Sequence, residues 1–87
     1  MMADSDSDSS FYLAEQVVSG TRFQTSAEFC AHVYSAVLQG LPDQVIVYTN
    51  ISVPWGNEAI YYLDDVLKGR RFRKDYNSVT KELSVRL

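Results

Sequence analysis

The sequence predicts a small α+β domain, a two-layer sandwich in which two helices pack on one face of a three- to four-stranded mixed or antiparallel sheet. Three observations favour this fold class. Residues 25–39 have helical periodicity, residues 44–49 form a β-branched and aromatic run, and a second helical pattern is followed by alternating apolar positions. The expected order is strand, helix, strand, helix, and then one or two strands.

The length of the chain, 87 residues, fits one domain. Residues 1–10 are rich in alternating serine and aspartate and offer little side-chain area to bury, so we expect a disordered acidic tail before a single domain over 11–87. Whether the serines of this tail are phosphorylated stays open. A core of this size leaves only about 3–5 kcal/mol of net stability, so that a homodimer or another partner would be a natural supplement.

The first strand is expected over residues 11–18, with a helix as the alternative. Apolar residues fall on both sides of a strand here, which favours a strand that is buried on one face and partly covered on the other. A Ser-Gly turn at 19–20 then allows residues 21–24 to return as a short hairpin arm.

Residues 25–39 are expected to form the first helix. Thr25 and Glu28 have the spacing of a capping box, and Gly40 in the left-handed conformation, followed by Pro42, would end the helix. Apolar residues cover most of the helix circumference, and the polar residues recur along one narrow stripe that we expect to face water. This stripe consists of Glu28, His32, Ser35 and Gln39.

Residues 44–49 are expected to form a central strand, because apolar side chains occupy both its odd and its even positions. A proline and a glycine within residues 51–56 indicate a loop or an edge segment. Asn57 is then a reasonable N-cap for a second helix over 58–68 that ends at Gly69.

The C-terminal part of the chain is expected to be extended. Residues 70–76 are basic, and the apolar positions after them mostly alternate, as in a last strand. Those positions are Val79, Leu83, Val85 and Leu87.

The polar residues give no catalytic or metal-binding constellation. A structural zinc site needs about four Cys or His ligands, and this chain has only Cys30 and His32, which lie two apart and so on divergent faces of a helix. We expect Cys30 in the core and His32, with Ser35, on the solvent-facing stripe. Asp64 and Asp65 are explained by solvation on the outer side of a helix. No glycine-rich phosphate loop is present, so we predict no cofactor and no enzymatic activity.

The start of the sequence lacks the basic and apolar regions of a signal peptide, and no apolar run is long enough to span a membrane. One cysteine excludes an internal disulfide and fits a reducing environment. The sequence therefore predicts a soluble, intracellular, cytoplasmic protein without a membrane association.

The charge is distributed unevenly along the chain. Residues 1–50 carry six acidic residues against Arg22 alone, whereas residues 51–87 carry seven basic and five acidic residues. Five of the eight basic residues fall within one short segment, namely Lys68, Arg70, Arg71, Arg73 and Lys74. Such a concentration of charge favours association with an oppositely charged surface.

Three interpretations of this basic segment stay open. The first is a protein contact, in which arginines supply charge complementarity and aromatic residues act as anchors. The second is a nucleic-acid groove that stacks a base on Phe72, and the third is an edge strand that its charges protect from aggregation. The candidate contact residues are Arg70, Arg71, Arg73 and Lys74 for charge, with Trp55, Phe72 and Tyr76 as anchors.

These observations predict a small non-enzymatic protein-binding module, such as an adaptor, an accessory subunit or a stoichiometric inhibitor. A viral or phage protein that blocks a host enzyme would also have this size and acidity. The alternative is a sequence-tolerant nucleic-acid-binding module that uses the basic segment, and the overall acidity of the chain weighs against it because acidic groups repel phosphates.

Overall fold

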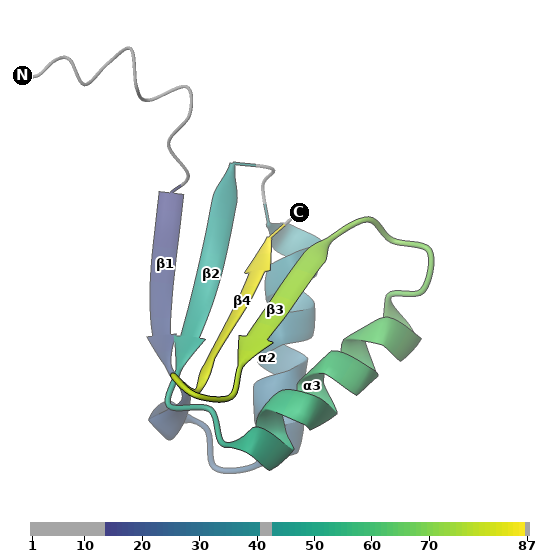
Figure 1. Ribbon diagram of the computed structural model, residues 1–87. Helices are drawn as coiled ribbons and strands as arrows, with labels where there is room; N and C mark the ends of the chain where they lie inside the picture. Colours follow the sequence, from purple (N-terminus) through teal and green to yellow (C-terminus); the bar gives the residue numbers. More distant parts are fainter. Residues whose placement is uncertain (1–13, 41–42, 87) are drawn as a thin grey trace, which may run out of the picture.

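A computed structural model of the chain describes residues 14–40 and 43–86, which form a four-stranded sheet with two helices packed against it (Figure 1). The strands are β1 (Ala14–Ser19), β2 (Gln44–Thr49), β3 (Arg73–Asn77) and β4 (Glu82–Arg86), and the helices are α2 (Ser26–Gln39) and α3 (Val53–Val66). The acidic tail expected over 1–10 lies outside the described residues, as do Pro42, Leu87 and the first part of the expected strand 11–18.

The strands lie in the order β1-β2-β4-β3. β1 and β2 are parallel and are joined by α2, whereas β4 runs antiparallel to both of its neighbours. In Figure 1, α2 lies behind the sheet and α3 runs past the β3 side. The predicted α+β sandwich, with its two helices on one face of a mixed sheet and its β-α-β-α-β order, is confirmed.

The core lies between the sheet and the helices. The largest fully enclosed side chains come from both layers and are Tyr48, Phe29, Ile51, Leu63, Leu83 and Val33. The rings of Phe29 and Tyr48 meet edge to face with their centroids 5.3 Å apart. Each such apolar side chain contributes about 1.5–3 kcal/mol when it is fully removed from water. Cys30 is buried among them, as expected.

Helix α2 begins as its capping box predicts. Thr25 Oγ1 accepts from the Glu28 backbone N–H at 3.1 Å, and Glu28 Oε1 accepts from the Gln24 backbone N–H at 2.8 Å. The prediction of a left-handed conformation for Gly40 is wrong, because this residue is extended, with φ −71° and ψ 154°. The helix ends instead with a bond of 3.4 Å from the Gly40 N–H to the Val37 carbonyl.

Helix α3 starts earlier than expected. The segment 51–56 was predicted to be a loop or an edge segment, and Asn57 to be the N-cap. The helix instead begins at Val53 with Ser52 as its N-cap, and Pro54 lies in its first turn, where a missing backbone N–H costs nothing. Gly56 allows the first turn of α3 to pack closely against β3. The Tyr76 ring lies so close over Gly56 that an added Cβ would come within 2.5 Å of it. A glycine that looked like a loop residue thus permits a helix–sheet contact.

Two smaller expectations are also wrong. The proposed hairpin arm over 21–24 is absent, and a short 3₁₀ helix at Gly20–Arg22 leads the chain from β1 toward α2. Val79 belongs to the turn between β3 and β4 rather than to the last strand, and its side chain is 88 % exposed. In that turn the Asn77 side chain accepts from the backbone N–H groups of Val79 and Thr80, which stabilises a tight reversal without an apolar contact.

The strand register divides the side chains of the sheet between two faces. Val18, Tyr48, Leu83 and Val85 point into the helix layer and are buried. The alternate positions form a second face that no described helix covers, here called the open face (Figure 1). It comprises Glu15, Val17 and Ser19 of β1, Val45, Val47 and Thr49 of β2, Arg73, Asp75 and Asn77 of β3, and Glu82, Ser84 and Arg86 of β4.

Candidate functional site

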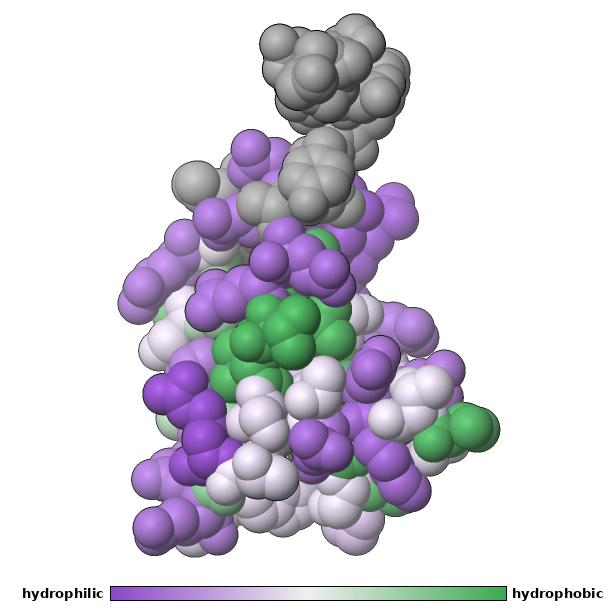
Figure 2. Space-filling model, turned by 90° about the vertical axis from the view of Figure 1, so that its left-hand side faces the viewer, coloured by the Kyte–Doolittle hydropathy of each residue, from purple (hydrophilic) through white to green (hydrophobic). Residues whose placement is uncertain are grey.

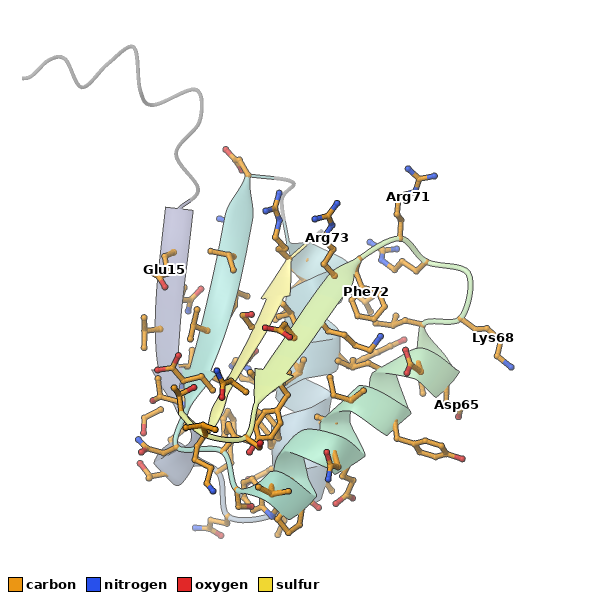
Figure 3. All side chains as sticks on the ribbon, in the orientation of Figure 1. Glu15, Asp65, Lys68, Arg71, Phe72 and Arg73 are labelled. Carbon is orange, nitrogen blue, oxygen red and sulfur yellow. The ribbon has the colours of Figure 1, made fainter. Side chains whose placement is uncertain are left out.

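The basic segment forms the connection from α3 to β3 and the first residues of that strand. Its arginines Arg70, Arg71 and Arg73 are exposed. Figure 3 shows Arg71 and Arg73 pointing away from the fold, while Phe72 between them turns toward α3. Alternation along an extended chain explains this split, because successive side chains point in opposite directions.

A fourth arginine joins them from the neighbouring strand. Arg86 of β4 is the direct register partner of Arg73, so both side chains emerge on the same face of adjacent strands. Directly opposite residues in an antiparallel pair have their Cβ atoms only about 4.5–5.5 Å apart. We call Arg70, Arg71, Arg73 and Arg86 the arginine cluster.

No arginine of the cluster forms an ion pair within the described part of the fold. Among residues 14–40 and 43–86, the single ion pair joins Lys74 to Asp64, and no carboxylate lies within ion-pairing distance of any cluster arginine. The Nε of Arg86 is enclosed by the protein and has no hydrogen-bond acceptor. Its neighbour Arg73 adds a like charge, which is destabilising at a directly opposed position. The cluster therefore carries positive charge that no described ion pair neutralises, with the Asp75 carboxylate lining the same hollow as Arg73 and Arg86.

Beside the arginine cluster the surface is hollowed. A shallow cavity of about 240 Å³ is lined by Val45, Arg73, Lys74, Asp75, Ser84 and Arg86. Val45 and Val47 continue the open face from this hollow toward β1, and both are partly exposed. An apolar strip thus borders the cationic groups, an arrangement that suits a protein contact better than charge alone.

Lys74 and Phe72 are engaged inside the molecule. Lys74 Nζ lies 2.5 Å from Asp64 Oδ1 on α3 and 5.2 Å from the centroid of the Phe72 ring. Phe72 itself packs against the core. Lys74 thus joins β3 to α3, and Phe72 packs beneath it against the core, so both side chains are engaged within the protein.

Trp55 and Tyr76 also have internal roles. Trp55 stacks on Phe29, with ring centroids 5.9 Å apart and an interplanar angle of 20°. The Tyr76 hydroxyl donates to the Ile51 carbonyl at 2.6 Å, and its ring covers Gly56. The two expected anchors therefore stabilise the start of α3.

Of the seven sequence-predicted contact residues, Arg70, Arg71 and Arg73 are exposed. Arg71 and Arg73 point the same way, and the structure adds Arg86 beside Arg73. Sequence reasoning missed Arg86 because it lies far from the basic segment along the chain. A signal was present, since a hairpin that pairs 73–77 with 82–86 places Arg73 and Arg86 on one face.

A second concave region lies between β1 and α2. This groove has a volume of about 410 Å³ and is lined mainly by polar residues: Gln16, His32, Ser35, Ala36, Gln39, Gly40, Gln44 and Ile46. His32 was expected to face water, but it is partly buried, and its Nδ1 lies 2.9 Å from the Tyr48 hydroxyl. Burial, and secondarily the nearby Arg22 charge, lower the pKa of His32 below 6.5. His32 is therefore neutral near pH 7 and satisfies a hydroxyl at the core boundary.

In the described part of the chain, no three His, Cys, Asp or Glu side chains are grouped so that they could hold a metal ion. The described helices also include none with the length and apolar character that crossing a membrane requires.

Comparisons with protein-family models, with curated proteins and with solved structures gave no match for this chain. Its function is therefore argued from the residues and their geometry.

Proposed function

We propose that this chain is a small non-enzymatic protein-binding module, acting as an adaptor, an accessory subunit or a stoichiometric inhibitor. The arginine cluster is its contact surface, and the partner presents carboxylates there. The carboxylates of the partner form the ion pairs that the cluster arginines do not form within the described residues.

The pairing of Arg73 with Arg86 is the observation that carries this proposal. Two cations at directly opposed positions weaken the β3–β4 hairpin, and no described carboxylate relieves them. Protection of the β3 edge accounts for Arg73 but not for Arg86, which lies on the inner strand β4. A partner carboxylate placed between two guanidinium groups could form charge-assisted, bidentate hydrogen bonds with both.

Protein is favoured over nucleic acid by the position of Phe72. Sequence-tolerant binding of single strands uses aromatic rings on which bases stack. Phe72 packs against the core and lies beneath Lys74, whose ammonium group is 5.2 Å from the ring centroid. The valines of the open face instead provide an apolar surface beside the charges, as protein interfaces require.

Affinity capture from the native host tests this proposal. The variant Arg70→Ser/Arg71→Ser/Arg73→Ser removes three cluster charges and leaves Lys74 with Asp64. Its matched control, Arg22→Ser/Lys81→Ser, removes two exposed cations that lie outside the cluster. We expect the wild type and the control to capture the same stoichiometric protein, and the cluster variant to lose it.

A labelled single-stranded oligonucleotide, titrated at low salt, separates the two classes of partner. Weak or absent binding by the wild type supports a protein partner. The proposal fails if the oligonucleotide binds tightly, with a steep loss of affinity as salt is added, or if the cluster variant still retains the captured protein.

A further inference from the structure

Strand β1 forms an unpaired edge of the sheet within the described residues. It pairs with β2 on one side only, so that alternate backbone N–H and C=O groups of β1 face away from the sheet. Backbone groups of this kind are satisfied by water or by another strand.

This edge lacks the features that usually prevent strand addition, which are proline, lysine and inward-pointing charge. Glu15 is its single charged residue, and Val17 is 61 % exposed at its centre. Figure 2 looks onto this side of the molecule and shows a hydrophobic area bordered by hydrophilic residues. The opposite edge differs, because β3 carries Arg73, Lys74 and Asp75, and its Lys74 bonds to α3.

The two ends of β1 have complementary chemistry on the open face. Glu15, near the start of the strand, presents an exposed carboxylate. Ser19, at the other end, has a hydroxyl oxygen that accepts from the Thr21 backbone N–H and from Asn50 Nδ2, each at 3.4 Å, and that lies 2.9 Å from Thr21 Oγ1. With Thr21 Oγ1 as a donor to this oxygen, the Ser19 hydroxyl can donate its own hydrogen to a carboxylate when two such strands run antiparallel.

We propose that two copies of this chain pair through β1, antiparallel, about a two-fold axis at Val17. This register places Val17 against Val17 of the second copy and Glu15 against Ser19 of the second copy, while Gln16 meets Val18 of the second copy. The valines of both open faces then form one continuous apolar row, because Val17 is already the register partner of Val47. An isologous interface needs this kind of self-complementarity.

The neighbouring register is less favourable. An axis at Gln16 would place the Glu15 carboxylate opposite Val17 of the second copy, where it would find no donor. In the Val17-centred register, the single charge of β1 meets a hydroxyl and never its own symmetry mate. Because β1 complements itself in this register, we assign its free edge to a second copy of the chain.

The dimer is independent of the proposed function. Joining the two β1 edges produces one continuous sheet and leaves β3, with its arginines, at each far end. In Figure 3, Glu15 lies on β1 and Arg73 on β3, the two opposite edges of the sheet. Both arginine clusters remain accessible in the dimer, so failure of the dimer leaves the cluster proposal untouched.

Size-exclusion chromatography with light scattering over a concentration series tests the dimer. The wild type should approach twice the monomer mass, and Val17→Lys, which opposes two ammonium groups at the axis, should weaken association at least about tenfold. Val79→Lys is the control, since Val79 is 88 % exposed and lies in the β3–β4 turn, outside β1, and it should associate like the wild type. A monomeric wild type, or a dimer that Val17→Lys leaves intact, overturns the proposal.

A cysteine placed on the axis tests the register itself. Directly opposed Cβ atoms lie close enough for a disulfide after a small adjustment, whereas the natural Cys30 is buried. Oxidation should convert Val17→Cys, but neither Val79→Cys nor the wild type, into a covalent dimer. Equal crosslinking of Val17→Cys and Val79→Cys would contradict the Val17-centred register.

Discussion

Two tyrosines reach from the sheet into the helix layer, and each finds a polar partner there. The Tyr48 hydroxyl lies 2.9 Å from His32 Nδ1, and the Tyr76 hydroxyl donates to the Ile51 carbonyl at 2.6 Å. A buried tyrosine needs such a partner, because an unsatisfied hydroxyl costs about 1–3 kcal/mol. These residues therefore fix how the helices sit on the sheet.

Gly56→Ala should destabilise the protein by about 1–3 kcal/mol, the usual cost of forcing an extra carbon into a packed site. The added Cβ would lie 2.5 Å from the Tyr76 ring, whose hydroxyl bond to Ile51 limits how far the ring can move. Urea denaturation, followed by circular dichroism, measures the change in the free energy of unfolding.

Asn57→Ala is the control for this substitution, because Asn57 is the next residue of α3 and is exposed. Its change should stay within about 0.5 kcal/mol. Equal stabilities of Gly56→Ala and the wild type would show that the α3–β3 contact is looser than described.

The stability of the protein should fall as the pH decreases below about 6.5, because His32 has a lowered pKa in the folded state. Over this range the unfolded chain gains a proton that folded His32 does not, so that unfolding becomes more favourable. The loss should level off once the pH falls below the pKa of folded His32. Chemical denaturation from about pH 7 to about pH 5.5, above most carboxylate titrations, measures this dependence.

The variant His32→Gln isolates this effect, because an amide can still hydrogen-bond Tyr48 but does not titrate. Its free energy of unfolding should change less than that of the wild type over the same pH range. Parallel curves for the two proteins would assign the pH dependence to other groups.

Among the secondary-structure elements, α2 and β2 were predictable because local signals agreed. Thr25 and Glu28 mark the start of α2, and the β-branched run of β2 has no competing helical pattern. The start of α3 was missed for a tertiary reason. Gly56 looked like a loop residue until the ring of Tyr76, distant in sequence, was found to cover it.

The candidate site could likewise be predicted only in part, because some of its residues come together through strand pairing. The concentration of arginines in 70–73 was visible in the sequence, and their exposure followed from it. The inclusion of Arg86 depended on the β3–β4 register, and the internal roles of Trp55 and Tyr76 depended on how α3 packs. Neither register nor packing is fixed by local composition.

Arg73→Glu should stabilise the β3–β4 hairpin while it removes a cluster charge. It replaces an opposed pair of like charges with an opposite pair, Glu against Arg86, which is worth about 0.2–1 kcal/mol in a cross-strand position. Thermal or urea unfolding measures the gain in the free energy of unfolding. Arg71→Glu is the control, because Arg71 has no cross-strand partner in the described residues, and its free energy of unfolding should stay within about 0.5 kcal/mol of the wild type. A less stable Arg73→Glu protein would mean that the arginine pair serves the fold.

At the scale of the whole molecule, the sheet presents different chemistry at its two ends. The β1 edge offers unpaired backbone groups and exposed valine. Strands β3 and β4, at the other end, carry arginines that form no ion pair within the described residues. The helices occupy the opposite face and bury the core. Under the two proposals, an acidic partner and a second copy of the chain bind to different parts of one sheet.

The most direct test is the affinity of Arg86→Ser for the captured protein partner, measured by titration calorimetry beside Arg73→Ser and the control Lys81→Ser. Arg86 lies outside the basic segment and belongs to the contact surface only if the strand register places it there. Each lost charge-assisted bond is worth about 1.5–3 kcal/mol, so Arg86→Ser and Arg73→Ser should each weaken binding about tenfold or more, while Lys81→Ser binds like the wild type. A folded Arg86→Ser protein with unchanged affinity would contradict the account.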